Sequence, residues 1–181
     1  MVYLLEAAVK QFDSAPQKSR AGLIKALDRA DNSLAEARRL ITDMRIPALE
    51  HNTLPEALRE TTHQMVNGMP VDFEFEVYGS TKPGHYDVDA NLFLIGREAL
   101  ANSLNHAGAD RIRMELNYTT KGLGLMVEDN GSGFDPEEAR AKSGHQGFRG
   151  MEERARSIGG ALAVESRRGK GTKIVVRVPW T

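Results

Sequence analysis

An acid and an amide one helical turn apart are the first residues in this sequence whose types and spacing point to chemistry. Glu98 and Asn102 lie four residues apart in a segment that favours a helix from residue 90 to about 107, so they stack on one helix face. The amide oxygen of Asn102 suits Mg²⁺, a hard cation that shares its coordination shell with phosphates and water. The carboxylate of Glu98 can orient or deprotonate an attacking group. The alternative is an ordinary solvated helix face.

A second acid stands where an expected strand ends. Asp129 closes an apolar run and is followed by Asn130, Gly131 and Gly133. A carboxylate in this place can accept a hydrogen bond from an exocyclic amine such as that of adenine, and the two glycines leave room for a ligand. Asn-Gly is also a strong turn signal, but no strand resumes before Gly147. Irregular segments of that length are usually functional, and many of them are lids.

Two further glycine clusters follow along the chain. Gly147-Phe148-Arg149-Gly150-Met151 is expected to open a helix, where backbone N–H groups favour phosphate oxygens. Gly169-Lys170-Gly171-Thr172 is a tight turn that ends in a hydroxyl, and alone it indicates only a hairpin. Neither cluster is a Walker sequence or a dinucleotide fingerprint. Because all of these features occur together, the sequence favours a nucleotide site.

Secondary structure signals place these residues on a two-layer domain. A helix is expected from Thr53, the N-cap, to about Val66, with Glu56 completing a capping box. The alternating pattern of residues 73–77 predicts a half-buried strand. The later elements are predicted in the order helix, strand, strand, loop, helix, strand and strand, over 90–107, 111–118, 123–129, 130–147, 148–158, 161–166 and 172–178. Both strand pairs are predicted hairpins, so we expect an α+β fold with a mixed, largely antiparallel sheet and helices on one face.

A heptad pattern occupies the region before this domain. Apolar residues at alternating steps of four and three form a seam made of Leu23, Leu27, Ala30, Leu34, Ala37, Ile41 and Met44. A similar stripe in residues 2–12, and a turn at 13–16, complete a predicted helical hairpin. Such a seam packs either on the rest of its own chain or in a dimeric four-helix bundle.

Composition excludes several classes of function. The 181 residues suffice for one domain with a small appended element, and 40% of them are hydrophobic. There is no cysteine, which excludes disulfides and thiolate metal sites and fits a reducing cytoplasm. The net charge of −1, without a basic stripe, argues against direct nucleic-acid binding. We find no membrane-spanning segment and no signal peptide, so the expected location is the cytoplasm, with anchoring of a longer parent left open.

The clustered motifs resemble those of a known superfamily. They look like the N, G1, G2 and final glycine boxes of the GHKL ATPases, at residues 97–102, 129–133, 147–151 and 169–172. The stretch from His145 to Ala155, with Gly159-Gly160 beyond it, is similar to the sensor histidine kinases that signal to NarL/LuxR-type response regulators, the nitrate-sensor-like branch. Residues 37–49 resemble the end of their dimerisation helix.

This resemblance implies a fold and an activity. The fold is the α/β sandwich of these ATPases, the GHKL or Bergerat fold, at residues 49–181. Residues 1–48 are a partial dimerisation hairpin that holds a homodimer. The implied activity is that of the ATP-binding catalytic portion of a two-component protein histidine kinase. It transfers the γ-phosphoryl group of ATP to a histidine and thence to a NarL/LuxR-type response regulator.

The resemblance also implies a role for each site residue. Asn102 binds Mg²⁺, Glu98 polarises the acceptor, and Asp129 bonds the adenine amine with help from Thr172 through water. The other residues expected to contact or shape the ATP site are Asn105, His106, Gly131, Gly133, Gly147, Phe148, Gly150, Met151 and Gly171. Members often carry Lys where this chain has Asn105, so one phosphate-facing charge is missing.

The phospho-acceptor histidine of the family is not found in its expected place. Residues 1–12 contain no histidine, and none of the five histidines lies on a heptad helix. We therefore expect the isolated chain not to autophosphorylate. A nucleotide-binding module without kinase activity stays open as an alternative. An anti-sigma-factor-type serine kinase shares the boxes but lacks a heptad hairpin, and a gyrase-like clamp needs additional domains.

Overall fold

A computed structural model describes residues 17, 23, 46–81, 84–137 and 146–180. The chain divides into two compact units, Met1–Arg45 and Ile46–Thr181. The predicted hairpin and its heptad seam fall in the first unit, where only Gln17 and Leu23 are described, both as helical residues. The hairpin therefore stays a prediction, and the fold that follows is that of the second unit.

The second unit contains a five-stranded sheet. Its strands are β1 (Asp72–Tyr78), β2 (Arg111–Tyr118), β3 (Gly122–Asp129), β4 (Ala161–Ser166) and β5 (Thr172–Pro179). They lie in the order β1-β2-β3-β5-β4, with β1 parallel to β2 and the other neighbouring pairs antiparallel. The predicted hairpins β2–β3 and β4–β5 are confirmed, and so is the mixed, largely antiparallel sheet.

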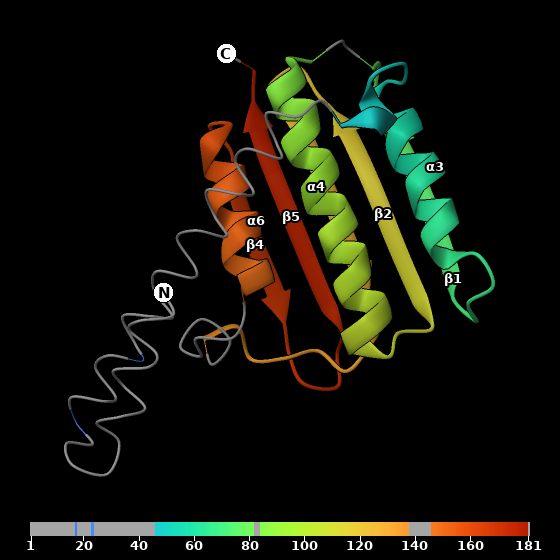
Figure 1. Cartoon of the computed structure of the whole chain (residues 1–181), viewed down its shortest axis with the longest axis vertical. Coiled ribbons are helices and arrows are strands. Elements are labelled where there is room, and N and C mark those ends of the chain that lie inside the picture. Colours follow the sequence, from blue (N-terminus) through green and yellow to red (C-terminus); the bar gives the residue numbers. More distant parts are fainter. Residues whose placement is uncertain (1–16, 18–22, 24–45, 82–83, 138–145, 181) are drawn as a thin grey trace. The chain divides into compact units, whose positions relative to one another are not determined.

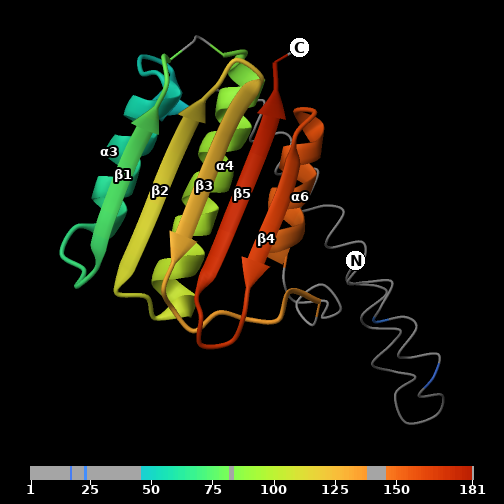
Figure 2. The same ribbon diagram turned by 180° about the vertical axis from the view of Figure 1, so that it is seen from behind.

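Three helices cover one face of this sheet. They are α3 (Leu54–Val66), α4 (Tyr86–Asn102) and α6 (Gln146–Ser157). Figure 1 shows them over the strands, and Figure 2 shows the opposite face, which no helix of the described residues covers. That face carries cross-strand ion pairs, such as Lys173–Glu128 at 3.8 Å between β5 and β3, as expected where one face of an antiparallel sheet meets water. The predicted two-layer α+β class is confirmed.

The hydrophobic core fills the space between the two layers. On β2 every second side chain points inward, and Ile112, Met114 and Leu116 are fully buried. On α4 the buried residues recur at helical spacing and include Ile95 and Leu100. These two periods, two residues in a strand and 3.6 in a helix, let one apolar layer pack on the other. The core thereby fixes how α4 is rotated above the sheet.

The predicted start of α3 is confirmed in detail. Glu56 Oε2 accepts hydrogen bonds from the backbone N–H of Thr53 at 2.8 Å and from its hydroxyl at 2.7 Å. The first of these is the carboxylate half of a capping box, and the two bonds together lower the pKa of Glu56. A short 3₁₀ helix, η1 (Pro47–Leu49), precedes α3.

The helix predicted for 90–107 consists of two different elements. It begins earlier than predicted, at Tyr86, and changes after Asn102 into a π-helical turn, η2 (Ser103–Ala107). Gly108 then ends the turn with a φ of 60°. π-helical turns are rare overall, but those that occur often lie at functional sites. They have no simple sequence signal. The period of the apolar residues could not reveal this change.

Candidate functional site

The segments that carry the predicted site residues meet at one end of the sheet. Figure 1 shows the C-terminal end of α4, the loop after β3, the first turn of α6 and the β4–β5 turn together there. Two backbone hydrogen bonds join three of these segments. The N–H of Ser132 donates to the carbonyl of Ala107 at 2.7 Å, and the N–H of Gly169 donates to the carbonyl of Ser132 at 2.5 Å. The loop after Asp129 is therefore held between η2 and the β4–β5 turn.

These segments enclose a cavity of about 540 Å³. Nine of the predicted site residues line it: Glu98, Asn102, His106, Asp129, Gly133, Gly147, Phe148, Met151 and Thr172. Sequence reasoning did not assign a site role to the other lining residues, which are Ala99, Ser103, Ala107, Ser132, Phe134 and Ile174. The acid, the amide and the glycine-bearing loops thus converge on one space.

Four predicted site residues are not among those that line the cavity. Asn105 is exposed on η2, and Gly150 is buried within α6. At Gly131 an added Cβ would lie 2.5 Å from the carbonyl oxygen of Ala107, so no side chain fits there. Gly171 has a φ of 75°, and a Cβ there would collide with the carbonyl of Asp129. These two glycines allow close approach of the backbone segments beside the cavity.

Asp129 is the most precisely held group of the site. Its side chain is buried, its Oδ1 accepts a hydrogen bond from the N–H of Gly131 at 2.9 Å, and its Oδ2 accepts one from the hydroxyl of Ser103 at 2.9 Å. An ionised carboxylate offers about four acceptor sites and no donor. Two acceptor sites therefore remain for a ligand that donates hydrogen bonds. The sequence analysis assigned no site role to Ser103, although it directly follows Asn102.

Thr172 stands beside Asp129 at the start of β5. The two residues are paired across β3 and β5, and both are almost fully buried. The Thr172 hydroxyl oxygen lies 3.0 Å from the hydroxyl oxygen of Ser166, the last residue of β4. This end of the cavity therefore carries a carboxylate and a hydroxyl at adjacent positions.

Glu98 and Asn102 face the first turn of α6. A Cβ added at Gly147 would collide with Glu98 Oε1 and would lie 3.8 Å from Asn102 Nδ2. The absence of a side chain at Gly147 therefore lets the start of a helix approach the acid–amide pair. The N–H groups at a helix start favour anions. The predicted phosphate position and the predicted metal position are thus neighbours.

The charge of the lining tests whether Mg²⁺ fits this site. Among the described lining residues there are two carboxylates, Glu98 and Asp129, one histidine, His106, and no Lys or Arg. The described residues contain no group of three or more His, Cys, Asp and Glu side chains that could hold a metal alone. Asn102 offers one neutral oxygen, which is the kind of ligand Mg²⁺ accepts when phosphate oxygens and water supply the others. The donor set fits a metal that arrives with a polyphosphate.

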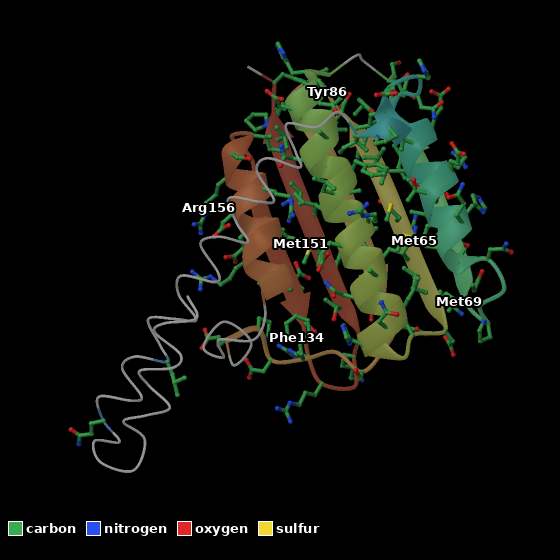
Figure 3. The ribbon with its side chains drawn as sticks, in the orientation of Figure 1. Met65, Met69, Tyr86, Phe134, Met151 and Arg156 are labelled. Carbon is green, nitrogen blue, oxygen red and sulfur yellow. The ribbon has the colours of Figure 1, made fainter. Side chains whose placement is uncertain are left out.

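Aromatic and thioether side chains form an apolar wall of the cavity. Phe134 and Phe148 meet edge to face, with ring centroids 6.2 Å apart, and Met151 is fully buried behind them. Figure 3 shows Phe134 in the loop at the site end of the sheet and Met151 on α6. A wall of this kind suits a flat, weakly polar ring such as a purine.

Comparison with known proteins assigns the family. The model of the histidine kinase-, DNA gyrase B-, and HSP90-like ATPases matches residues 87–181, more than half of the chain. The chain belongs to this ATPase family. Its matched region begins in the first turn of α4 and includes every residue that lines the cavity.

The relatives are sensor proteins. Sensor histidine kinase LiaS of Bacillus subtilis is 32% identical over 176 residues, which are 97% of this chain and 48% of LiaS. Nitrate/nitrite sensor protein NarX of Escherichia coli K12 is 32% identical over 92% of this chain and 27% of NarX. The chain thus spans about half of LiaS and about a quarter of NarX.

A solved structure supports the fold. The histidine kinase domain of the Erythrobacter litoralis EL346 blue-light activated histidine kinase matches with a TM-score of 0.57 and 18% sequence identity, over 98% of this chain and 83% of that one. In addition, no helix of the described residues is both long enough and apolar enough to cross a bilayer.

Proposed function

We propose that this chain is the ATP-binding catalytic portion of a two-component sensor histidine kinase. The observation that carries the proposal is the single cavity lined by Asn102, Asp129 and Gly147, in a chain of this ATPase family whose relatives are sensor histidine kinases. Because the chain spans half or less of those relatives, the activity of the whole protein is part of the proposal. Residues 49–181 are the catalytic domain, and residues 1–48 are the partial dimerisation hairpin.

The adenine ring binds at the Asp129 end of the cavity. Asp129 accepts from the exocyclic amine, Thr172 contributes its hydroxyl, and Phe148 and Met151 contact the ring. All four residues line the cavity, Asp129 from the end of β3, Thr172 from the start of β5, and Phe148 and Met151 from α6. Glycines at 131, 133 and 171 shape the loops around this end, and Gly150 shapes the start of α6. The arrangement supports a base that presents hydrogen-bond donors to Asp129.

The phosphates bind where α4 and α6 face each other. Asn102 holds Mg²⁺. Because the described lining contains no Lys or Arg, the metal ion supplies the positive charge that neutralises the phosphates. The start of α6 contributes backbone N–H groups and His106 contributes its imidazole. Asn105 is exposed on η2 and does not line the cavity, so we propose it only as an outer contact of the phosphates. Phosphoryl transfer depends mainly on such positioning and charge neutralisation.

The acceptor is a histidine outside residues 1–48, which contain none. Glu98 orients its imidazole for attack, since the carboxylate lines the cavity next to Gly147. The phosphoryl group then passes to an aspartate of a NarL/LuxR-type response regulator, and the hairpin holds two chains together. The parallel with NarX supports that choice of regulator class.

Calorimetry with two variants tests the site. We expect Asp129→Asn to weaken ATP binding about tenfold or more, with or without Mg²⁺, because a hydrogen bond to a charged group is lost. We expect Asn102→Ala to remove the gain in affinity that Mg²⁺ provides and to leave binding in EDTA unchanged. Asp72→Asn and Asn117→Ala, exposed residues on the uncovered sheet face, are the matched controls. Unchanged binding in both site variants would overturn the assignment.

Phosphotransfer separates a kinase from a passive binder. The full chain is mixed with a separately produced acceptor-helix dimer from a relative and with ATP labelled on its γ-phosphate. A kinase labels the acceptor, and Glu98→Gln slows labelling while ATP affinity stays the same. Binding without any labelling would favour a nucleotide-binding module.

A further inference from the structure

The hydroxyl of Ser166, which lies outside the cavity, forms a hydrogen bond with the hydroxyl of Thr172, which lines it. Ser166 Oγ has three partners: the backbone N–H of Phe134 at 2.9 Å, the carbonyl oxygen of Gly171 at 3.0 Å and the hydroxyl oxygen of Thr172 at 3.0 Å. Ser166 does not line the cavity, whereas Thr172 does. The three contacts join the loop after β3 to the β4–β5 turn.

Counting protons gives each of these hydrogen bonds a direction. The N–H of Phe134 can only donate, so Ser166 Oγ accepts that bond. The carbonyl of Gly171 can only accept, so Ser166 donates its single proton there. The remaining bond, between Ser166 and Thr172, must then be donated by Thr172. Ser166 uses its proton and both lone pairs, and all three bonds are satisfied.

The proton of Thr172 therefore points away from the cavity. Its hydroxyl oxygen presents lone pairs to a base that contacts it directly, and the carboxylate oxygens of its neighbour Asp129 also accept hydrogen bonds. Asp129 and the Thr172 hydroxyl therefore both present acceptor oxygens at this end of the cavity. A base with an amine at the matching position gains hydrogen bonds here, and a base with a carbonyl there meets repulsion between lone pairs.

We propose that Ser166 is a positioning residue that fixes the proton of Thr172 and thereby makes the site select a 6-amino purine over a 6-oxo purine. The inference rests on the proposed function, because it presumes that a purine nucleotide binds in this cavity. It adds a residue that has no contact with the ligand. Without Ser166, the Thr172 hydroxyl would rotate and could donate to a carbonyl.

Adenosine and inosine diphosphates are suitable probes, since they carry an amine and a carbonyl at the same ring position. Their dissociation constants are measured by calorimetry without Mg²⁺ on the wild type, Ser166→Ala, Thr172→Val and the double variant. We expect the wild type to bind ADP more tightly than inosine diphosphate. Each single variant should reduce the ratio of the two dissociation constants about tenfold, the effect expected from the loss of one hydrogen bond. The double variant should lose no more than Thr172→Val alone, because Ser166 acts through Thr172.

Two further variants separate positioning from a general loss of structure. Ser166→Thr keeps a hydroxyl and should keep the wild-type preference for ADP. Ser157→Ala removes an exposed hydroxyl that donates to the carbonyl of Arg154 at the end of α6, and it should also leave the preference unchanged. If Ser166→Ala does not fold, Thr172→Val still tests the proposal, because an unchanged preference in that variant would overturn it.

The measurements distinguish failure of the positioning role of Ser166 from failure of the proposed function. A uniform loss of affinity for both nucleotides in Ser166→Ala, or effects of the two single variants that add, would overturn the positioning role alone. A wild-type chain that binds neither nucleotide would overturn the proposed function and this inference together.

Discussion

At the scale of single residues, the site depends on small polar groups that hold larger ones. Asp129 is the residue expected to accept a hydrogen bond from the adenine base, and its orientation is set by the hydroxyl of Ser103 and the N–H of Gly131. The Ser103 oxygen also lies 3.1 Å from the carbonyl of Ala99, one turn back along α4. The buried carboxylate is therefore fastened to α4 and to its own loop at once.

Removal of the Ser103 hydroxyl should weaken nucleotide binding. We expect Ser103→Ala to raise the dissociation constant for ADP about tenfold, because Asp129 Oδ2 loses a charge-assisted hydrogen bond and gains freedom to turn. Calorimetry measures this, and a thermal melt checks that the fold survives. An ADP affinity equal to that of the wild type would show that Gly131 alone suffices to hold the carboxylate.

A second, half-buried carboxylate, that of Asp89, lies in the first turn of α4 and should make stability depend on pH. Burial raises the pKa of Asp89 to about 6 from its ordinary value of 3.8. The folded state therefore binds more protons than the unfolded state between these values, so stability falls as pH rises through that window. Above about pH 6 the cost of the buried charge is fully present.

Asp89→Asn removes that cost without changing the size of the side chain. We expect the variant to be more stable than the wild type by about 1 kcal/mol at pH 7, a figure reduced because the carboxylate is partly exposed, and to converge with it near pH 4. Urea unfolding at several pH values measures the difference. Asp87→Asn, exposed in the same turn, is the control for loss of charge at a helix start. A difference that does not vary with pH would contradict the argument.

At the scale of elements, the strands were the easiest part to predict and the end of α4 was the hardest. Alternating apolar residues gave β2 its bounds and both hairpins their turns, since side chains on a strand must alternate between core and water. The π turn at Ser103–Ala107 has no such periodic cause. Both Asn105 and His106 are exposed on this turn, but only His106 lines the cavity, which sequence spacing alone could not decide.

Two glycines of β3 show how differently one residue type can act within a strand. At Gly122 an added Cβ would collide with the backbone carbonyl of Val178, whereas at Gly124 the nearest atom would be 3.7 Å away. Gly124 thus has room for a side chain. A glycine in a strand interior costs stability where a side chain would fit.

Opposite effects on stability follow for the two positions. We expect Gly124→Ala to raise the free energy of unfolding by about 0.5 kcal/mol and Gly122→Ala to lower it by about 2 kcal/mol or more. Urea unfolding measures both, and each variant serves as the control for the other. Equal effects would mean that the two glycines differ less than their neighbours suggest.

At the scale of the whole molecule, sequence reasoning anticipated the catalytic fold and the convergence of the site. The N-terminal helix pair rests on the heptad seam alone, because its residues, apart from Gln17 and Leu23, lie outside the described part of the chain. The residues that the site prediction missed include two hydroxyls, Ser103 and Ser166, which contact Asp129 and Phe134 far away in the sequence. Such contacts follow from tertiary packing and have no local pattern.

The heptad seam predicts a change in oligomeric state between two lengths of the protein. We expect the full chain to be a dimer and a fragment of Ile46–Thr181, one of the two compact units, to be a monomer, because only the full chain carries the heptad seam that a dimeric four-helix bundle would bury. Size exclusion with light scattering measures both masses. A monomeric full chain would mean that the seam packs within its own chain.

The parallel pairing of β1 with β2 has a consequence for the order in which the domain acquires its structure. The hairpins β2–β3 and β4–β5 close over short turns, but β1 reaches its neighbour only after the chain has passed through α4. Contacts between residues far apart in the chain form slowly, since the entropy of the intervening loop is lost before they stabilise anything. We therefore expect β1 to pair with β2 only after the two hairpins have formed. Amide exchange during refolding should find the amides shared within β2–β3 and within β4–β5 protected before those of β1.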